Sequence, residues 1–186
     1  MRRRKEKDDF TGNKIAEYVD QGERVPTPVI FKIWMEKLEQ FKQRDLEGFV
    51  IDGSPRTVME AEMLDRALDW YEWEDKKVVF VDVSEEESTE RLLHRRVCED
   101  CGEIYPYTQE YRDRDRCEEC DGKLVTREDD TKEGIEQRWS WYREEVKPVV
   151  DYYEERGLLK RVDGEQTIEQ VYKDLLEAVT KSTTPT

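Results

Sequence analysis

Long apolar stretches are missing from this 186-residue sequence, in which 35 % of the residues are hydrophobic and 42 % are charged. No stretch approaches the roughly 18 apolar residues of a membrane-spanning helix, so we expect no membrane partner. Five Trp, nine Tyr and five Phe still provide the large side chains that a disordered chain lacks. Length and composition together predict one compact domain that carries an inserted subdomain.

Negative charge outweighs positive charge. The sequence has 32 Lys and Arg against 47 Asp and Glu, which gives a formal net charge of −15. Such a surface repels nucleic acid, which we exclude as a partner, and any phosphate ligand must be held by a local cluster of arginines. Residues 1–5 are predicted to be a solvated helix end rather than a targeting signal. Because its cysteines are expected to be reduced, we expect a cytoplasmic protein. Residues 181–186 are predicted to be a frayed tail.

Cysteine is confined to one short region, as two Cys-x-x-Cys pairs with fifteen residues between them. These residues are Cys98, Cys101, Cys117 and Cys120. Two such pairs can close a tetrahedral thiolate cage around one zinc ion, and four protein ligands make such a site structural rather than catalytic. Gly102 and Gly122 follow the pairs and are predicted to adopt the positive φ that folds the backbone over a metal. Two disulfides or four unrelated buried thiols are the alternatives, which the lack of other cysteines and of a secretory signal disfavours.

Patterns typical of strands and helices alternate along the sequence. Apolar runs predict strands over residues 48–52, 77–83 and 158–162. Helices are predicted after the N-caps Thr27, Ser54, Ser84 and Thr167, and over residues 131–156 with a break at Pro148. The helix after Ser84 is expected to carry Arg91 and Arg95, four residues apart, on one face. This alternation predicts an α/β fold with a parallel sheet.

The segment Gly48-Phe-Val-Ile-Asp-Gly-Ser-Pro-Arg-Thr57 resembles the Gly-Phe-x-x-Asp-Gly-Phe-Pro-Arg-Thr signature of adenylate kinases. Further matching segments follow the family's order along nearly the whole chain: residues 12–26, 95–98, 127–130, 148–153 and 162–164. The resemblance implies a P-loop kinase-like parallel sheet core and magnesium-dependent, reversible phosphoryl transfer from ATP to AMP, which gives two ADP. It also implies that the cysteine module is the zinc-binding lid of such an enzyme.

The resemblance further implies a division of the chain and a set of site residues. Residues 1–96 would be a partial core with the acceptor-nucleotide helices, 97–127 the lid, 128–180 the rest of the core and 181–186 a tail. Catalytic roles are implied for Asp52, Arg56, Arg95, Arg127 and Arg138. ATP binding is implied for Arg91, Arg95 and Gln166. AMP binding is implied for Arg2, Glu23, Arg24, Val25, Gly53, Arg56, Glu60, Arg127 and Arg138.

These roles agree with the chemistry of the side chains. The planar guanidinium of arginine stays charged and binds phosphate through two parallel hydrogen bonds. Asp52 would lie at the carboxyl end of a strand, where open α/β sheets bind ligands, and would orient the water shell of the Mg²⁺ that accompanies ATP. We expect the complete enzyme to be a monomer.

Each residue also has an ordinary structural interpretation. Asp52-Gly53 can be only a turn, and Arg91 and Arg95 can belong to a solvated face. Asp129 and Asp130 can be surface acids or a helix cap, which is the interpretation we favour for Asp130. The order of several motifs along the chain favours the functional interpretation for the arginines and for Asp52.

Three departures from the family pattern stand out. No Gly-x-x-x-x-Gly-Lys-Ser/Thr occurs, so the loop that cradles phosphates is not in this sequence. We expect the sequence to be truncated at its N-terminus, without the first strand, P-loop and first helix, and to be poorly stable and nearly inactive alone. Glu60 replaces a glutamine that pairs with the acceptor adenine, and Ser54 replaces a phenylalanine. The alternatives are a non-catalytic nucleotide-binding remnant, a kinase that tolerates GMP, and a zinc-ribbon adaptor, which the acidic composition disfavours.

Overall fold

The computed structural model describes residues 4, 6–21, 23–127 and 129–180. Two compact units divide the chain between Asp75 and Lys76, and each is described by itself. The predicted boundaries at residues 96 and 127 both fall within the second unit and stay a prediction. No helix among the described residues is long and apolar enough to cross a lipid bilayer.

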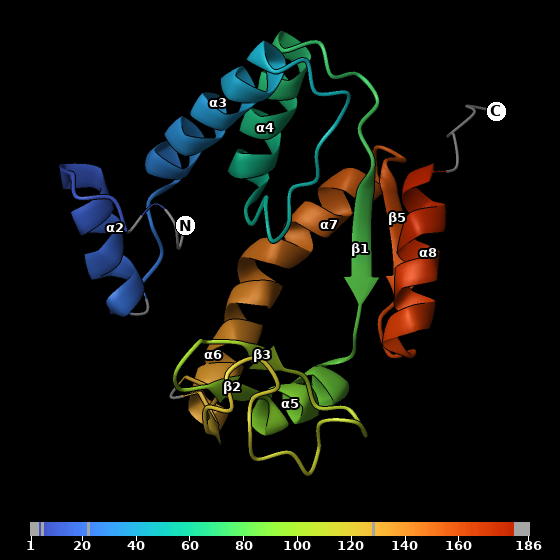
Figure 1. Cartoon of the computed structure of the whole chain (residues 1–186). Coiled ribbons are helices and arrows are strands. Elements are labelled where there is room, and N and C mark those ends of the chain that lie inside the picture. The colour runs from blue at the N-terminus through green and yellow to red at the C-terminus, as the bar shows by residue number, and fades with distance from the viewer. Residues whose placement is uncertain (1–3, 5, 22, 128, 181–186) are drawn as a thin grey trace. The chain divides into compact units, whose positions relative to one another are not determined.

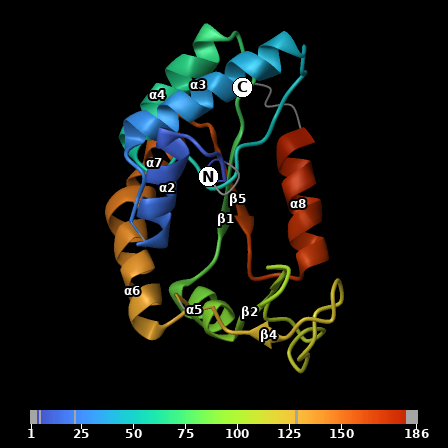
Figure 2. The same cartoon turned by 60° about the vertical axis from the view of Figure 1, so that its left-hand side comes forward.

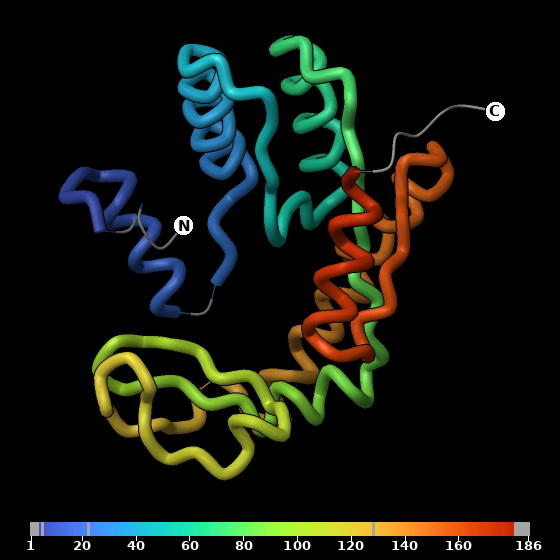
Figure 3. The backbone as a smooth tube through the Cα atoms, turned by 45° about the vertical axis from the view of Figure 1, so that its right-hand side comes forward, coloured from blue at the N-terminus to red at the C-terminus, as the bar shows by residue number. Residues whose placement is uncertain are grey.

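The described part of the first unit is helical. It contains α2 (Phe10–Asp20), α3 (Thr27–Gln43) and α4 (Val58–Trp70). Helices α3 and α4 pack against each other and are drawn side by side as tubes in Figure 3. Their buried hydrophobic side chains are Leu38 from α3 and Ala61, Leu64 and Ala67 from α4.

Two of the predicted helix starts in this unit are wrong by a few residues. Thr27 is the first residue of α3 rather than its cap, and Pro26 stands at the cap position. Ser54 does not cap α4, because Thr57 does: its hydroxyl accepts a hydrogen bond from the amide of Glu60 at 3.1 Å. Thr57 has the extended backbone that an N-cap requires, with φ −132° and ψ 157°.

The strand predicted over residues 48–52 does not form. A strand exists only when its amides and carbonyls pair with a neighbour, and no described strand lies beside this segment. Val50 is consequently 90 % exposed. Phe49 instead packs against the rings of Phe41 and Trp73, with centroid distances of 5.1 and 4.8 Å. Aromatic packing thus replaces the predicted sheet contacts.

The second unit holds the parallel strand pair that the sequence predicts. Strand β1 (Val78–Asp82) pairs with β5 (Leu159–Asp163) in a register that runs from Val78 opposite Leu159 to Asp82 opposite Asp163. The two arrows lie side by side in Figure 1. Helices α7 (Lys147–Glu154) and α8 (Ile168–Thr180) contact these strands and lie on opposite faces of the pair (Figure 2). The α/β class and the parallel sheet are therefore confirmed, with two strands rather than three among the described residues.

Helix α5 (Glu85–His94) begins as predicted and ends earlier than predicted. The Ser84 hydroxyl accepts a hydrogen bond from the amide of Glu87 at 3.3 Å, and Glu165 accepts one from the amide of Ser84 at 2.8 Å. The helix stops at His94, because Arg95 is extended with φ −60° and ψ 141°. The prediction that Arg91 and Arg95 share a helix face is therefore wrong.

The long helical stretch is interrupted just before Pro148, as predicted. Helix α6 (Lys132–Trp141) passes into one π-helical turn, η1 (Tyr142–Val146), and then into α7. Proline lacks an amide hydrogen and its ring crowds the carbonyl four residues earlier, so a widened turn relieves the conflict. Gly157, at φ +67°, follows the end of α7, and the Thr167 hydroxyl caps α8 by accepting from the amide of Gln170 at 3.3 Å.

The cysteine module forms a small three-stranded antiparallel sheet. Its strands are β2 (Arg96–Cys98), β3 (Ile104–Tyr105) and β4 (Leu124–Val125), in the order β3-β2-β4. Cys98, Tyr105 and Leu124 of these strands form a compact core with Cys117, and Tyr111 packs against it. A core this small needs a covalent or metal cross-link for independent stability.

Candidate functional site

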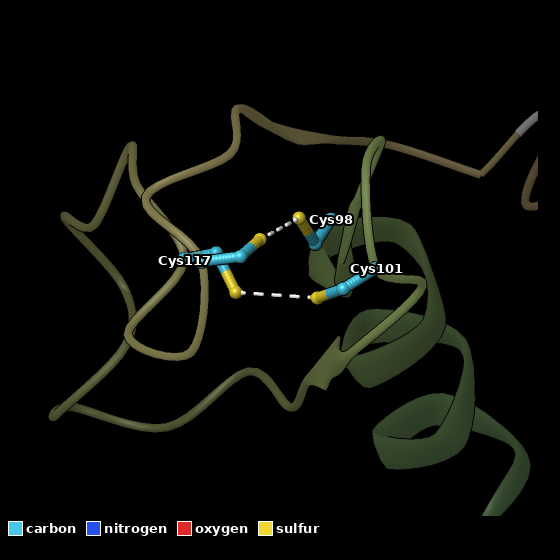
Figure 4. A group of neighbouring side chains, drawn as sticks. Cys98, Cys101 and Cys117 are labelled. Atoms are coloured by element: carbon cyan, nitrogen blue, oxygen red, sulfur yellow. Dashed lines mark hydrogen bonds between the residues drawn. The ribbon is translucent and has the colours of Figure 1, made fainter.

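The four cysteines converge on one point. All four Sγ atoms lie within 4.8 Å of one another, with Cys98 and Cys120 at 3.4 Å and Cys101 and Cys117 at 3.5 Å. Figure 4 shows the sulfurs of Cys98, Cys101 and Cys117 directed toward a common centre. A disulfide needs an S–S distance of about 2.05 Å, so the predicted alternative of two disulfides is wrong, as is that of unrelated thiols. Zn–S bonds of about 2.3 Å place tetrahedral sulfurs about 3.8 Å apart, which this donor set fits.

Glycine serves the two cysteine loops for different reasons. Gly102 adopts φ +74° directly after Cys101, as predicted. In the second loop the positive φ belongs to Asp121, at +60°, so the prediction for Gly122 is wrong. Gly122 is required for space instead, because a Cβ atom there would lie 2.7 Å from the Cys98 sulfur.

The environment of the sulfurs favours a bound cation. The Tyr105 hydroxyl donates a hydrogen bond to the Cys117 sulfur at 3.4 Å and lowers the pKa of that thiol to about 6. The Gly122 amide acts to lower the pKa of Cys120, but the sulfurs of Cys98 and Cys101 outweigh it and raise that pKa to about 12. Four crowded thiols therefore cannot all ionise at neutral pH by themselves. A divalent cation at their centre would remove the repulsion among the thiolates.

A second cluster joins arginines from three separate segments. Arg95, at the end of α5, binds Asp130 through Nε and Nη2 at 2.9 and 2.7 Å. Arg138, on α6, donates to the same carboxylate through Nη1 at 2.9 Å. Asp130 is buried and caps nothing, because the hydroxyl of Thr131 caps α6. The interpretation of Asp130 as a surface acid or helix cap is therefore wrong.

Asp129 extends this cluster to a third arginine. Arg127 donates to both of its carboxylate oxygens, at 2.9 and 2.8 Å, and Arg138 Nη2 reaches Oδ2 at 2.5 Å. Partial burial acts to raise the pKa of Asp129, but the hydrogen bonds and charges of Arg127 and Arg138 outweigh it and lower that pKa. Neither aspartate is among the site residues predicted from the sequence. Two adjacent carboxylates directly after one predicted site arginine were the available signal.

The two remaining residues predicted for ATP lie near the carboxyl end of β5. Arg91 donates to the carbonyl oxygen of Gly164 at 2.8 Å and to Glu87 at 2.6 Å. Gln166 donates to the carbonyl of Asp163 at 3.1 Å. The structure therefore brings Arg91 to the turn that contains Gln166.

In the first unit, part of the predicted acceptor site comes together. Arg56 donates from Nε to the carbonyl of Gly53 at 2.8 Å, and its amide donates to the carboxylate of Glu60 at 2.7 Å. Glu60 is buried. Burial and the charge of Arg56 lower the pKa of Arg24, while Glu60 acts to raise it, which places these three ionisable side chains near one another.

For the other described residues predicted to bind the acceptor nucleotide, the structure gives a position and an exposure. Glu23 is exposed and Val25 is half-buried, both in the segment that leads into α3. Arg2 lies outside the described residues. Asp52 is exposed in an irregular segment, so the prediction that it lies at the carboxyl end of a strand is wrong. Its predicted link to Mg²⁺ stays a prediction, as do the roles of all these residues.

Comparison with known proteins identifies the family. The family model described as adenylate kinase matches residues 1–158. The chain is 40 % identical to the adenylate kinase of Archaeoglobus fulgidus over 167 residues, which cover 88 % of this chain and 75 % of that protein. It is 38 % identical to the adenylate kinase of Thermotoga maritima over 177 residues, 94 % of this chain and 79 % of that protein. This chain belongs to the adenylate kinase family of phosphotransferases.

Proposed function

We propose that this protein takes part in magnesium-dependent, reversible phosphoryl transfer from ATP to AMP, which gives two ADP. The observation that carries the proposal is the convergence of Arg95, Arg127 and Arg138 on two adjacent carboxylates. In a chain of net charge −15, a local group of three guanidiniums is what a nucleotide polyphosphate requires. Membership of the adenylate kinase family supplies the reaction.

The chemistry of the transfer explains why arginines matter. Phosphoryl transfer depends on positioning and on stabilisation of charge rather than on a protein nucleophile. We assign Arg127 and Arg138 to the transferring group, Arg95 to the ATP phosphates and Arg91 to the adenine ring. Mg²⁺ bound with ATP would supply positive charge beside the phosphates, and we assign Asp52 to the orientation of its water ligands. Zinc at the four cysteines would hold the lid together and take no part in the reaction.

The acceptor nucleotide is assigned to the cluster in the first unit, where Arg56 would bind the monophosphate. The carboxylate of Glu60 can only accept hydrogen bonds. It can accept one from the exocyclic amine of adenine, but it offers no donor to adenine N1. Guanine presents N1–H and an amine to the same carboxylate. We therefore infer a weakened preference for AMP and some tolerance of GMP.

The 186 residues contain no Gly-x-x-x-x-Gly-Lys-Ser/Thr loop. The backbone amides and lysine of that loop hold the phosphates of ATP during transfer. We therefore expect this chain by itself to bind nucleotide but to transfer phosphate much more slowly than the roughly 1–100 per second of typical kinases. A non-catalytic nucleotide-binding protein is the second candidate, and the same missing loop favours it. A monomeric state, a cytoplasmic location and the lack of a nucleic-acid partner stay predictions.

Two measurements test these proposals. Calorimetric titration with Mg·ATP compares Arg95→Ala with Arg112→Ala, which removes an exposed lid arginine that lies over the Tyr107 ring. We expect roughly a tenfold or greater loss of affinity for Arg95→Ala, because hydrogen bonds to charged groups are lost, and less than twofold for the control. Equal losses would contradict the assigned site. Formation of ADP from ATP, AMP and Mg²⁺ then distinguishes a slow kinase from a protein that only binds nucleotide.

A further inference from the structure

The two aspartates of the arginine cluster differ in their access to water. The side chain of Asp130 is 0 % exposed, whereas that of Asp129 is 51 % exposed. Both carboxylates accept hydrogen bonds from guanidinium groups, so the difference in exposure does not come from a missing partner. The side chain of Asp129 therefore has more freedom to move than that of Asp130, although both belong to one cluster.

Asp130 is a fixed brace between two segments. Its Oδ1 accepts from both Arg95 and Arg138, and its Oδ2 accepts a second bond from Arg95. Its amide donates to the carbonyl of Arg127 at 3.1 Å, which holds the backbone of the same loop. A buried carboxylate with these bonds cannot leave without stranding two guanidinium groups.

Asp129 meets its two arginines in a geometry that a phosphate group can also adopt. Its two oxygens face Nε and Nη2 of Arg127, the paired geometry in which guanidinium binds either carboxylate or phosphate. Its Oδ2 also meets Arg138, so one anion bridges two arginines. Because the side chain is half exposed, it can rotate into solvent at the small cost typical of surface ion pairs.

We propose that Asp129 is an internal anion that occupies the phosphate seat between Arg127 and Arg138, and that an incoming polyphosphate displaces it while Asp130 stays in place. The inference rests on the assignment of this cluster to nucleotide phosphates under Proposed function. Asp129 keeps the two guanidiniums together before nucleotide arrives. It also sets a threshold, because only a ligand with more negative charge than one carboxylate competes well for both arginines.

Tripolyphosphate binding tests this exchange without nucleotide or catalysis. Isothermal titration of the 186-residue chain with inorganic tripolyphosphate at low ionic strength would compare Asp129→Asn, Asp130→Asn and Asp113→Asn. Asp113 is an exposed lid residue that makes no ion pair within the described part of the chain, so it controls for the same change in net charge. We expect Asp129→Asn to bind about three- to tenfold more tightly than Asp113→Asn, since a competing anion has been removed. Asp130→Asn should bind no more tightly than Asp113→Asn.

A gain in affinity cannot come from damage to the fold, which makes the Asp129 result specific. The proposal is overturned if Asp129→Asn binds equally to or more weakly than Asp113→Asn, or if none of the proteins binds tripolyphosphate. Equal gains in affinity for Asp129→Asn and Asp130→Asn would also overturn it, because the two aspartates would then compete equally with the polyphosphate. Failure of the 186-residue chain to form ADP would favour the protein that only binds nucleotide, and would leave this comparison of affinities unaffected.

Discussion

Replacement of Asp130 by asparagine should destabilise the second unit far more than the same change at Asp129. Three hydrogen bonds of 2.7–2.9 Å reach the Asp130 carboxylate from Arg95 and Arg138. An asparagine oxygen at the Oδ1 position keeps two of them, and its amide group then faces the Nε–H of Arg95. The substitution removes one charge-assisted hydrogen bond, which is worth about 1.5–3 kcal/mol. It also removes the negative charge that neutralises two guanidinium groups.

Partial exposure of the arginines limits this cost. Removing one partner of a fully buried ion pair costs about 3–5 kcal/mol, but the side chains of Arg95 and Arg138 are 21 % and 31 % exposed. We therefore expect a loss of about 2–3 kcal/mol for Asp130→Asn and below about 1 kcal/mol for Asp129→Asn. With a urea m-value of about 2 kcal/mol/M, the midpoint should fall by about 1–1.5 M for Asp130→Asn and by less than about 0.5 M for Asp129→Asn. Urea unfolding followed by tryptophan fluorescence, to which Trp139 and Trp141 of α6 contribute, measures both shifts. Equal shifts would refute the assignment of Asp130 as the brace of the cluster.

Three other changes test the metal centre and the acceptor site. Cys98→Ser should leave less than one bound zinc per chain, measured by mass spectrometry, and should lower the melting temperature. Chelation should lower the melting temperature of the unaltered protein in the same way. An unchanged melting temperature would exclude a structural zinc. Gly122→Ala places a Cβ atom 2.7 Å from the Cys98 sulfur and should weaken zinc binding by about tenfold or more. The control Gly48→Ala, where no atom lies within 4 Å of the added Cβ, should leave zinc binding unchanged. Competition with a chromogenic chelator measures both affinities. Glu60→Gln should raise the preference for AMP over GMP in nucleotide titrations, and an identical preference in both forms would remove the acceptor hypothesis.

Local signals along the sequence correctly predicted several features that depend on local bonding, although not the caps at Thr27 and Ser54. Ser84 and Thr167 cap their helices because a hydroxyl needs only the amide three residues later. Pro148 interrupts its helix because the ring conflicts with its own chain. The segment at residues 48–52 failed because a strand depends on a distant partner that no local pattern supplies. Arg95 left the predicted helix for a similar reason, since it turns into the sheet of the cysteine module.

The sequence by itself determined the family, the cysteine quartet and which arginines are candidates for phosphate binding, because motif order and residue spacing are written along the chain. Only the tertiary structure decided that Arg95, Arg127 and Arg138 meet on two carboxylates, since those contacts join α5, α6 and the loop between β4 and α6. It also decided that Asp130 is buried while Asp129 is half exposed. Burial depends on what folds over a side chain, and two identical neighbouring residues carry no difference in sequence from which it could be predicted.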